Sequence, residues 1–72
     1  GEDVDFVIES GDRLLPIEIK STERPKYDDM KHLRTFSSEY GKQSRSGLLL
    51  HNGKLLDWLA PNVLAAPWWM VI

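Results

Sequence analysis

The sequence predicts a small α/β domain with a mixed sheet and one covering helix, and three patterns support this prediction. Residues 3–9 and 14–20 each alternate apolar and polar side chains, as strands do. Residues 26–40 instead repeat apolar side chains at spacings of three and four, which is typical of an amphipathic helix. Residues 48–50 are all leucine, and such a short apolar run favours a central strand buried on both faces. With a last strand at 63–66, the predicted order is β-β-α-β-β.

The two N-terminal runs are predicted to form a β-hairpin. The break between them contains Gly11 and Asp12, and a glycine supplies the positive φ that a tight turn needs. The register follows from burial, because the apolar positions of both strands must share one face of the sheet. These positions are Val4, Phe6, Ile8, Leu15, Ile17 and Ile19. With Gly11 and Asp12 at the centre of the turn, Asp5 faces Glu18.

This register brings three charged side chains together. Asp5 faces Glu18, and Lys20 lies two residues farther along the same face. At about 4 Å and an effective dielectric of about 20, two opposed carboxylates repel by on the order of 4 kcal/mol. A divalent cation that prefers oxygen ligands, Mg²⁺ or Mn²⁺, would remove this repulsion, and Lys20 could hold a metal-bound water. The alternative is an ordinary solvated polar face in which Lys20 neutralises its neighbours.

The same residues resemble a known superfamily. Asp5 on one strand, followed after a hairpin by Glu18, Ile19 and Lys20 on the next, resembles the motif of the PD-(D/E)xK nucleases. Val4 stands where that motif has Pro. More closely, residues 3–9, 16–21 and 66–69 resemble an uncharacterised C-terminal domain that follows AAA+-type ATPase modules in bacterial and archaeal proteins.

The resemblance implies a truncated restriction-endonuclease-like core and a metal-dependent enzyme that hydrolyses DNA phosphodiesters. Asp5 and Glu18 would bind Mg²⁺ or Mn²⁺, with the Ile19 carbonyl as a further ligand, and Lys20 would position the attacking water. An ATPase module would belong to the same parent chain. The alternative that the resemblance leaves open is a catalytically inactive nuclease fold used for regulation or protein interaction.

Composition limits the class of protein and its partners. We expect residues 1–72 to form a single domain with a thin core, cut from a larger chain. The net charge of −2 argues against strong general binding to nucleic acid, so a DNA-binding surface must be local. The chain has no cysteine and no apolar run near the roughly 20 residues of a membrane span, and we expect a cytoplasmic protein without membrane contact. An exposed sheet edge and the apolar residues 68–72 predict self-association.

The remaining polar residues allow two interpretations. Lys31, His32 and Arg34 on the helix, and the basic loop at 41–47, could contact DNA phosphates or could be ordinary solvated surface. His32 and His51 share no ligand-like spacing, so both are predicted to be surface residues.

The C-terminal part has weaker signals. Residues 54–59 are predicted to form a short strand or an irregular return, and Pro67 to open a last helical turn. Trp68 and Trp69 should pack against the sheet or a partner, with base stacking as the alternative.

Overall fold

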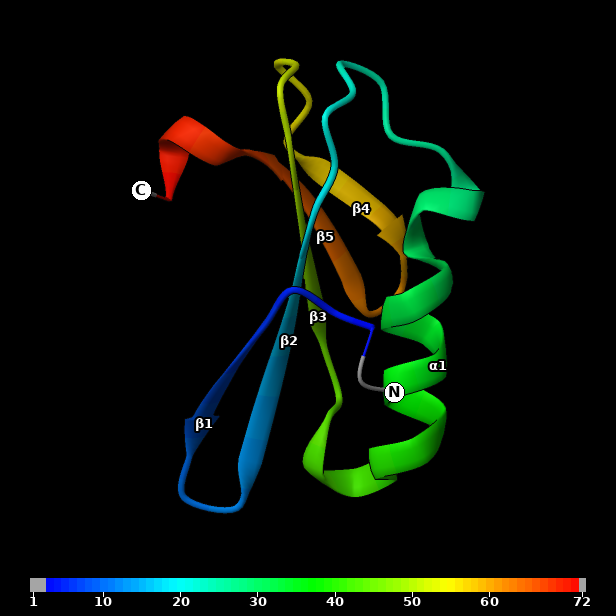
Figure 1. The fold of residues 1–72 in the computed structure, drawn as a ribbon, viewed down its shortest axis with the longest axis vertical. Helices are drawn as coiled ribbons and strands as arrows, with labels where there is room; N and C mark the ends of the chain where they lie inside the picture. The colour runs from blue at the N-terminus through cyan, green and yellow to red at the C-terminus, as the bar shows by residue number, and fades with distance from the viewer. Residues whose placement is uncertain (1–2, 72) are drawn as a thin grey trace.

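The computed structural model describes residues 3–71 as a five-stranded mixed sheet with a helix on one face (Figure 1). The elements are β1 (Phe6–Ser10), β2 (Arg13–Ile19), a 3₁₀ turn (Tyr27–Met30), α1 (Lys31–Tyr40), a 3₁₀ turn (Gly41–Gln43), β3 (Gly47–His51), β4 (Asp57–Ala60), β5 (Val63–Pro67) and a 3₁₀ turn (Trp68–Met70). The strand order is β1-β2-β3-β5-β4. This confirms the predicted α/β class, and β4 corresponds to the short strand that is one alternative for residues 54–59. No helix in the described part of the chain has the length and hydrophobicity of a membrane span.

The β1–β2 hairpin has the predicted register. Ser10 pairs with Arg13 and Phe6 pairs with Ile17. Gly11 has a φ of 63°, which is the positive value that the first central residue of a type II′ turn requires. The apolar side chains of the two strands therefore share one face of the sheet, because directly paired residues point to the same side.

The helix connects two parallel strands. β2 and β3 run in the same direction, and so do β3 and β5, whereas β4 returns antiparallel to β5. β3 is therefore the central strand that the leucine run predicts, and Leu49 and Leu50 are 0% and 2% exposed. The carboxyl ends of β2, β3 and β5 consequently lie at the same edge of the sheet.

The helical segment has the predicted ends. Its first turn, Tyr27–Met30, is 3₁₀ in form, and Asp29 Oδ2 accepts a hydrogen bond from the Lys26 amide at 2.7 Å. This bond satisfies one of the backbone donors that a helix leaves free at its start. Gly41, with a φ of 51°, ends α1.

The apolar stripe of the helix packs on the sheet. Met30, Leu33 and Phe36 are 0%, 2% and 4% exposed, and Met30 and Leu33 form a core cluster with Leu49 of β3. Tyr40 lies at the margin and stacks on Phe36 with 4.4 Å between the ring centroids. The spacing of three residues therefore predicts the buried side of α1 correctly.

Alternation along the strands gives the sheet two unlike faces. The face beneath α1, which we call the helix-covered face, is closely packed; its buried residues include Pro16, Glu18, Leu49, His51, Val63 and Ala65. We call the opposite side the open face, and the strand register places on it Phe6, Ile8, Leu15, Ile17, Ile19, Leu48, Leu50, Trp58, Leu64 and Ala66.

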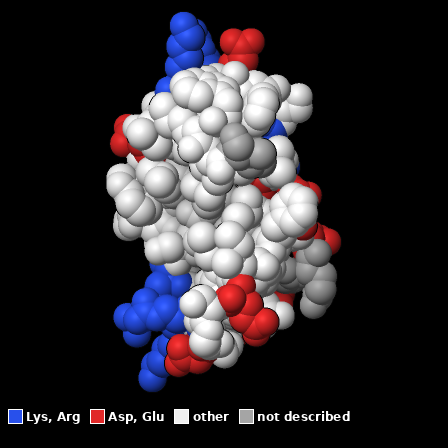
Figure 2. All heavy atoms as spheres, turned by 90° about the vertical axis from the view of Figure 1, so that its left-hand side faces the viewer, with Lys and Arg blue, Asp and Glu red and all other residues white. Residues whose placement is uncertain are grey.

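The β1 end of the open face is exposed, so the expectation that Phe6 and Ile8 lie in the core is wrong. Their exposed fractions are 60% and 54%. Within residues 3–71, no element covers this part of the sheet, and Figure 2 shows a broad uncharged surface on this side of the molecule. Val4 instead packs with the cluster beneath α1, because the paired part of the hairpin starts only at Phe6.

His51 is fully buried, so its predicted surface position is also wrong. Its Nδ1 accepts a hydrogen bond from the Gly53 amide at 3.0 Å, and its Nε2 donates to the Leu55 carbonyl at 2.8 Å. The imidazole thus carries its proton on Nε2 and holds the loop after β3 in place. The physical reason is alternation, since His51 shares the helix-covered face with Leu49.

Replacing Gly53 by Ala should destabilise the fold strongly. A Cβ atom at this position would overlap the Glu23 carbonyl oxygen, so the loops after β2 and β3 would have to separate. Separation would break the Asn52–Thr22 backbone hydrogen bond of 2.8 Å. We expect urea denaturation to show a loss of about 3 kcal/mol or more in the free energy of unfolding.

The control for this variant is Gly11→Ala. No atom lies within 4 Å of a Cβ at Gly11, so only the positive φ of 63° is penalised, by about 1 kcal/mol. Equal losses in the two variants would contradict the close approach of the loops at Gly53.

Candidate metal centre

Glu18 is a buried carboxylate on the helix-covered face of β2. Its exposed fraction is 3%, and the residue paired with it on β3 is the fully buried Leu49. Glu18 Oε2 has polar partners, whereas Oε1 is buried and has no hydrogen-bond partner within residues 3–71. A buried polar group left unpaired costs about 1–3 kcal/mol, and more when it is charged. The fold therefore presents an acceptor whose bonding is incomplete.

The shortest polar contact of Glu18 comes from helix α1. His32 Nδ1 lies 2.8 Å from Glu18 Oε2. An ionised carboxylate can only accept hydrogen bonds, so Nδ1 carries a proton and donates it. The His32 side chain is 36% exposed, which places it at the margin of the covered face. The expectation that His32 is an unrelated surface residue is therefore wrong.

Lys20 lies beside the same carboxylate. Its Nζ is 3.8 Å from Glu18 Oε2, and its side chain is 34% exposed. The Lys20 amide donates to the Leu50 carbonyl at 2.9 Å, so β3 holds the backbone of this residue. Alternation along β2 places Glu18 and Lys20 on one face, as the sequence predicts.

Asp5 approaches the same segment from the other arm of the hairpin. Its Oδ2 accepts a hydrogen bond from the Ile19 amide at 2.7 Å. Asp5 lies in the bend just before β1, one residue ahead of the Phe6–Ile17 pair. The structure thus brings Asp5 to the backbone between Glu18 and Lys20.

These oxygen atoms suit a hard divalent cation. The unpaired Oε1 of Glu18 is a ligand available without loss of an existing bond, and the Asp5 carboxylate and the Ile19 carbonyl are oxygen donors of the same kind. Within residues 3–71, no group of three or more His, Cys, Asp or Glu side chains is placed to hold a metal. Mg²⁺ commonly uses only one or two carboxylates, together with waters and substrate phosphates. Among these described groups, the one unpaired buried oxygen is Glu18 Oε1, so a cation bound at this place would take most of its other ligands from water or a substrate.

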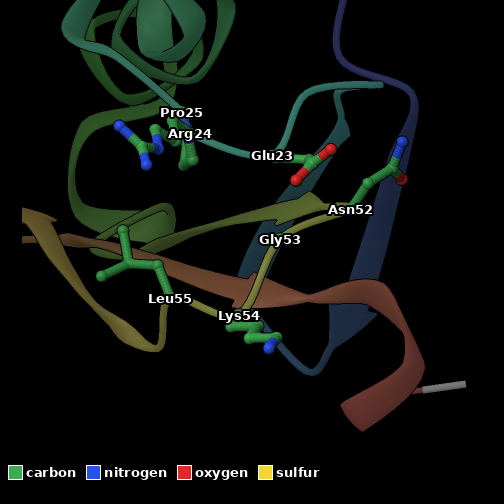
Figure 3. A pocket seen from close by; sticks show the side chains of 7 residues that line it. All are labelled: Glu23, Arg24, Pro25, Asn52, Gly53, Lys54 and Leu55. Atoms are coloured by element: carbon green, nitrogen blue, oxygen red, sulfur yellow. The ribbon is translucent and has the colours of Figure 1, made fainter.

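A pocket of about 610 Å³ opens at the same edge of the sheet, between the loops after β2 and β3 (Figure 3). Its lining residues are Glu23, Arg24, Pro25, Asn52, Gly53, Lys54 and Leu55. In Figure 3, Arg24, Pro25 and Leu55 lie at one end and Glu23 and Asn52 at the other. The charges in it are mixed, and it is separate from Asp5, Glu18 and Lys20.

The other predicted phosphate contacts lie elsewhere. Lys42 and Arg45 line a hollow with Arg13, at the start of β2, whereas Glu18 is near the end of that strand. On α1, the Arg34 guanidinium lies over the Tyr27 ring, 4.5 Å from its centroid. The structure therefore does not bring these three cations to the candidate centre.

His32 is the site residue that sequence analysis missed. A signal was present, because a glutamate on a buried strand face requires a polar partner. His32 lies between Met30 and Leu33, the two residues that fix the buried side of the helix. The direction in which the helix crosses β2 depends on the irregular connection after Lys20, and no sequence pattern specifies that direction.

Comparison with known proteins shows the family of this chain. No curated protein and no solved structure matched it. Residues 1–71 match the family described as Domain of unknown function (DUF4143). Because this match spans nearly all of the 72 residues, the chain belongs to the DUF4143 family.

Proposed function

We propose that this domain is a metal-dependent phosphodiesterase that acts on DNA, as its resemblance to the PD-(D/E)xK nucleases implies. The observation that carries the proposal is the buried Glu18 carboxylate with one unpaired oxygen, next to Lys20. An unpaired oxygen of this kind lowers stability, whereas a bound cation would complete its bonding. In this proposal, an ATPase module in the parent protein is the partner of the domain in the cytoplasm.

Each residue of the centre has its own role in the proposed reaction. Asp5 and Glu18 would hold the cation, with the Ile19 carbonyl as a further ligand. When bound, Mg²⁺ or Mn²⁺ supplies Lewis acidity toward the scissile phosphate and makes a water more acidic. The Lys20 ammonium group, 3.8 Å from Glu18 Oε2, holds the attacking water and offsets the negative charge that develops on the phosphate.

A second candidate function, a non-catalytic interaction module, is favoured by the open face. Phe6, Ile8 and Trp58 on this face are 60%, 54% and 56% exposed. β1 is also an edge strand, so its outer backbone groups are available for pairing. A second copy of the chain matches both features, because two antiparallel β1 strands related by a two-fold axis extend the sheet and join the two open faces.

Glu18→Gln should have different effects with and without metal. In the metal-free protein, it removes a buried charge but also weakens the contacts to His32 and Lys20, so the melting temperature should change little. With Mn²⁺ present, the wild-type protein should gain stability, whereas the variant should gain little because a ligand is lost. The control Glu9→Gln makes the same chemical change at an exposed position of β1 and should alter neither quantity. Unchanged Mn²⁺ stabilisation in Glu18→Gln would overturn the proposed metal centre.

Lys20→Ala should separate metal binding from catalysis. The variant keeps Asp5 and Glu18, so calorimetry should show nearly unchanged Mn²⁺ binding, while cleavage of duplex or single-stranded DNA should fall on the order of 100-fold. Metal binding by the wild-type chain without cleavage of duplex, junction or single-stranded DNA would favour the interaction module instead.

Ile8→Lys should prevent self-association. Sedimentation velocity at micromolar concentration should show a dimer for the wild-type chain and a monomer for this variant, because pairing of two β1 strands places the residue-8 side chains of both copies on one continuous face, where two lysine ammonium groups repel each other. Ser46→Lys adds the same charge at an exposed loop position and should leave the dimer intact. A monomeric wild-type chain would refute the second-copy proposal.

A further inference from the structure

We infer that His32 is a positioning residue that holds Glu18 as a one-oxygen ligand of the cation. This inference deepens the proposed function and rests on it. His32 occupies Oε2 of Glu18 and leaves Oε1 as the oxygen that is free to bind. Helix α1 thus contributes a hydrogen bond to the proposed metal ligand Glu18, and the hairpin motif by itself does not contain this contact.

The two partners of Glu18 differ in kind. The His32 contact, at 2.8 Å, has the length of a directional charge-assisted hydrogen bond, whereas Lys20 at 3.8 Å is beyond hydrogen-bond distance. The terminal torsion of a glutamate is broad and does not orient its carboxylate without help. His32 is therefore the group that determines which oxygen of Glu18 is presented.

The packing of α1 makes His32 a fixed support. Met30 and Leu33, on either side of it in the chain, are 0% and 2% exposed, and both pack against Leu49. Leu49 is also the residue paired with Glu18 across β2 and β3. The same core cluster thus holds both the histidine backbone and the strand that carries the glutamate.

The tautomer of the ring is the first test, and it needs no metal. In ¹⁵N NMR spectra of the metal-free wild-type chain, Nδ1 of His32 should carry a proton. His51 is an internal reference, because its Nδ1 accepts from the Gly53 amide and should carry none. Glu18→Leu should remove the Nδ1–H signature of His32 and leave His51 unchanged. A His32 ring with its proton mainly on Nε2 would overturn the inference.

Mn²⁺ binding to two His32 variants is the second test. His32→Asn puts an amide N–H close to the position of Nδ1, whereas His32→Leu removes the donor at similar volume. Calorimetric titration should show an increase in Kd on the order of 10-fold for His32→Leu and a much smaller increase for His32→Asn. Tighter Mn²⁺ binding by His32→Asn than by His32→Leu would identify the hydrogen bond as the cause. If His32 acted through packing alone, His32→Asn would not bind Mn²⁺ more tightly than His32→Leu.

The outcomes separate this inference from the proposed function. Mn²⁺ binding that requires Glu18 but is equal in wild type and His32→Leu would overturn the role of His32 and leave the metal centre standing. A wild-type chain that binds no Mn²⁺ would overturn both. If circular dichroism shows that His32→Leu does not fold, the test rests on the wild-type tautomer and on Mn²⁺ binding by His32→Asn. If His32→Asn loses as much Mn²⁺ binding as Glu18→Gln does, the result counts against the inference.

Discussion

A carboxylate is buried beneath the helix of this domain, and the elements around it must compensate its charge. Glu18 lies on the packed face of β2, opposite a fully buried leucine of β3, with one oxygen held by His32 and the other unpaired. Burial of charge is costly unless partners compensate it. The partners present are a histidine and a lysine that are each about one-third exposed, and both lie next to Oε2, so they compensate only one oxygen of the carboxylate from the margin of the site.

The surrounding fold is organised to support this position. The hairpin brings Asp5 to the end of β2, the parallel pairing with β3 holds the Lys20 backbone, and α1 crosses above with His32. His51 rigidifies the neighbouring loop through bonds to both of its ring nitrogens. Buried polar groups usually have a partner, and two buried side-chain oxygens of the described residues have none, Glu18 Oε1 and Ser44 Oγ. Of these two, only Glu18 Oε1 belongs to an ionisable group.

The two faces of the sheet support different kinds of function. The helix-covered face carries the acidic centre, and the open face carries exposed aromatic and aliphatic side chains such as Phe6 and Trp58. Large exposed apolar surfaces commonly mark interaction sites. Catalysis and association are compatible here, because the residues proposed for each lie on opposite sides of the same strands.

The sequence alone determined the β1–β2 register, the buried side of α1 and the proximity of Glu18 and Lys20, because all three follow from short-range periodicity and from the turn at Gly11. Tertiary structure decided the His32–Glu18 hydrogen bond, since it depends on how α1 crosses the sheet after an irregular connection. It likewise decided that Phe6 is exposed and that His51 is buried. Alternation shows which residues share a face, but only the packed arrangement of the elements shows which face is covered.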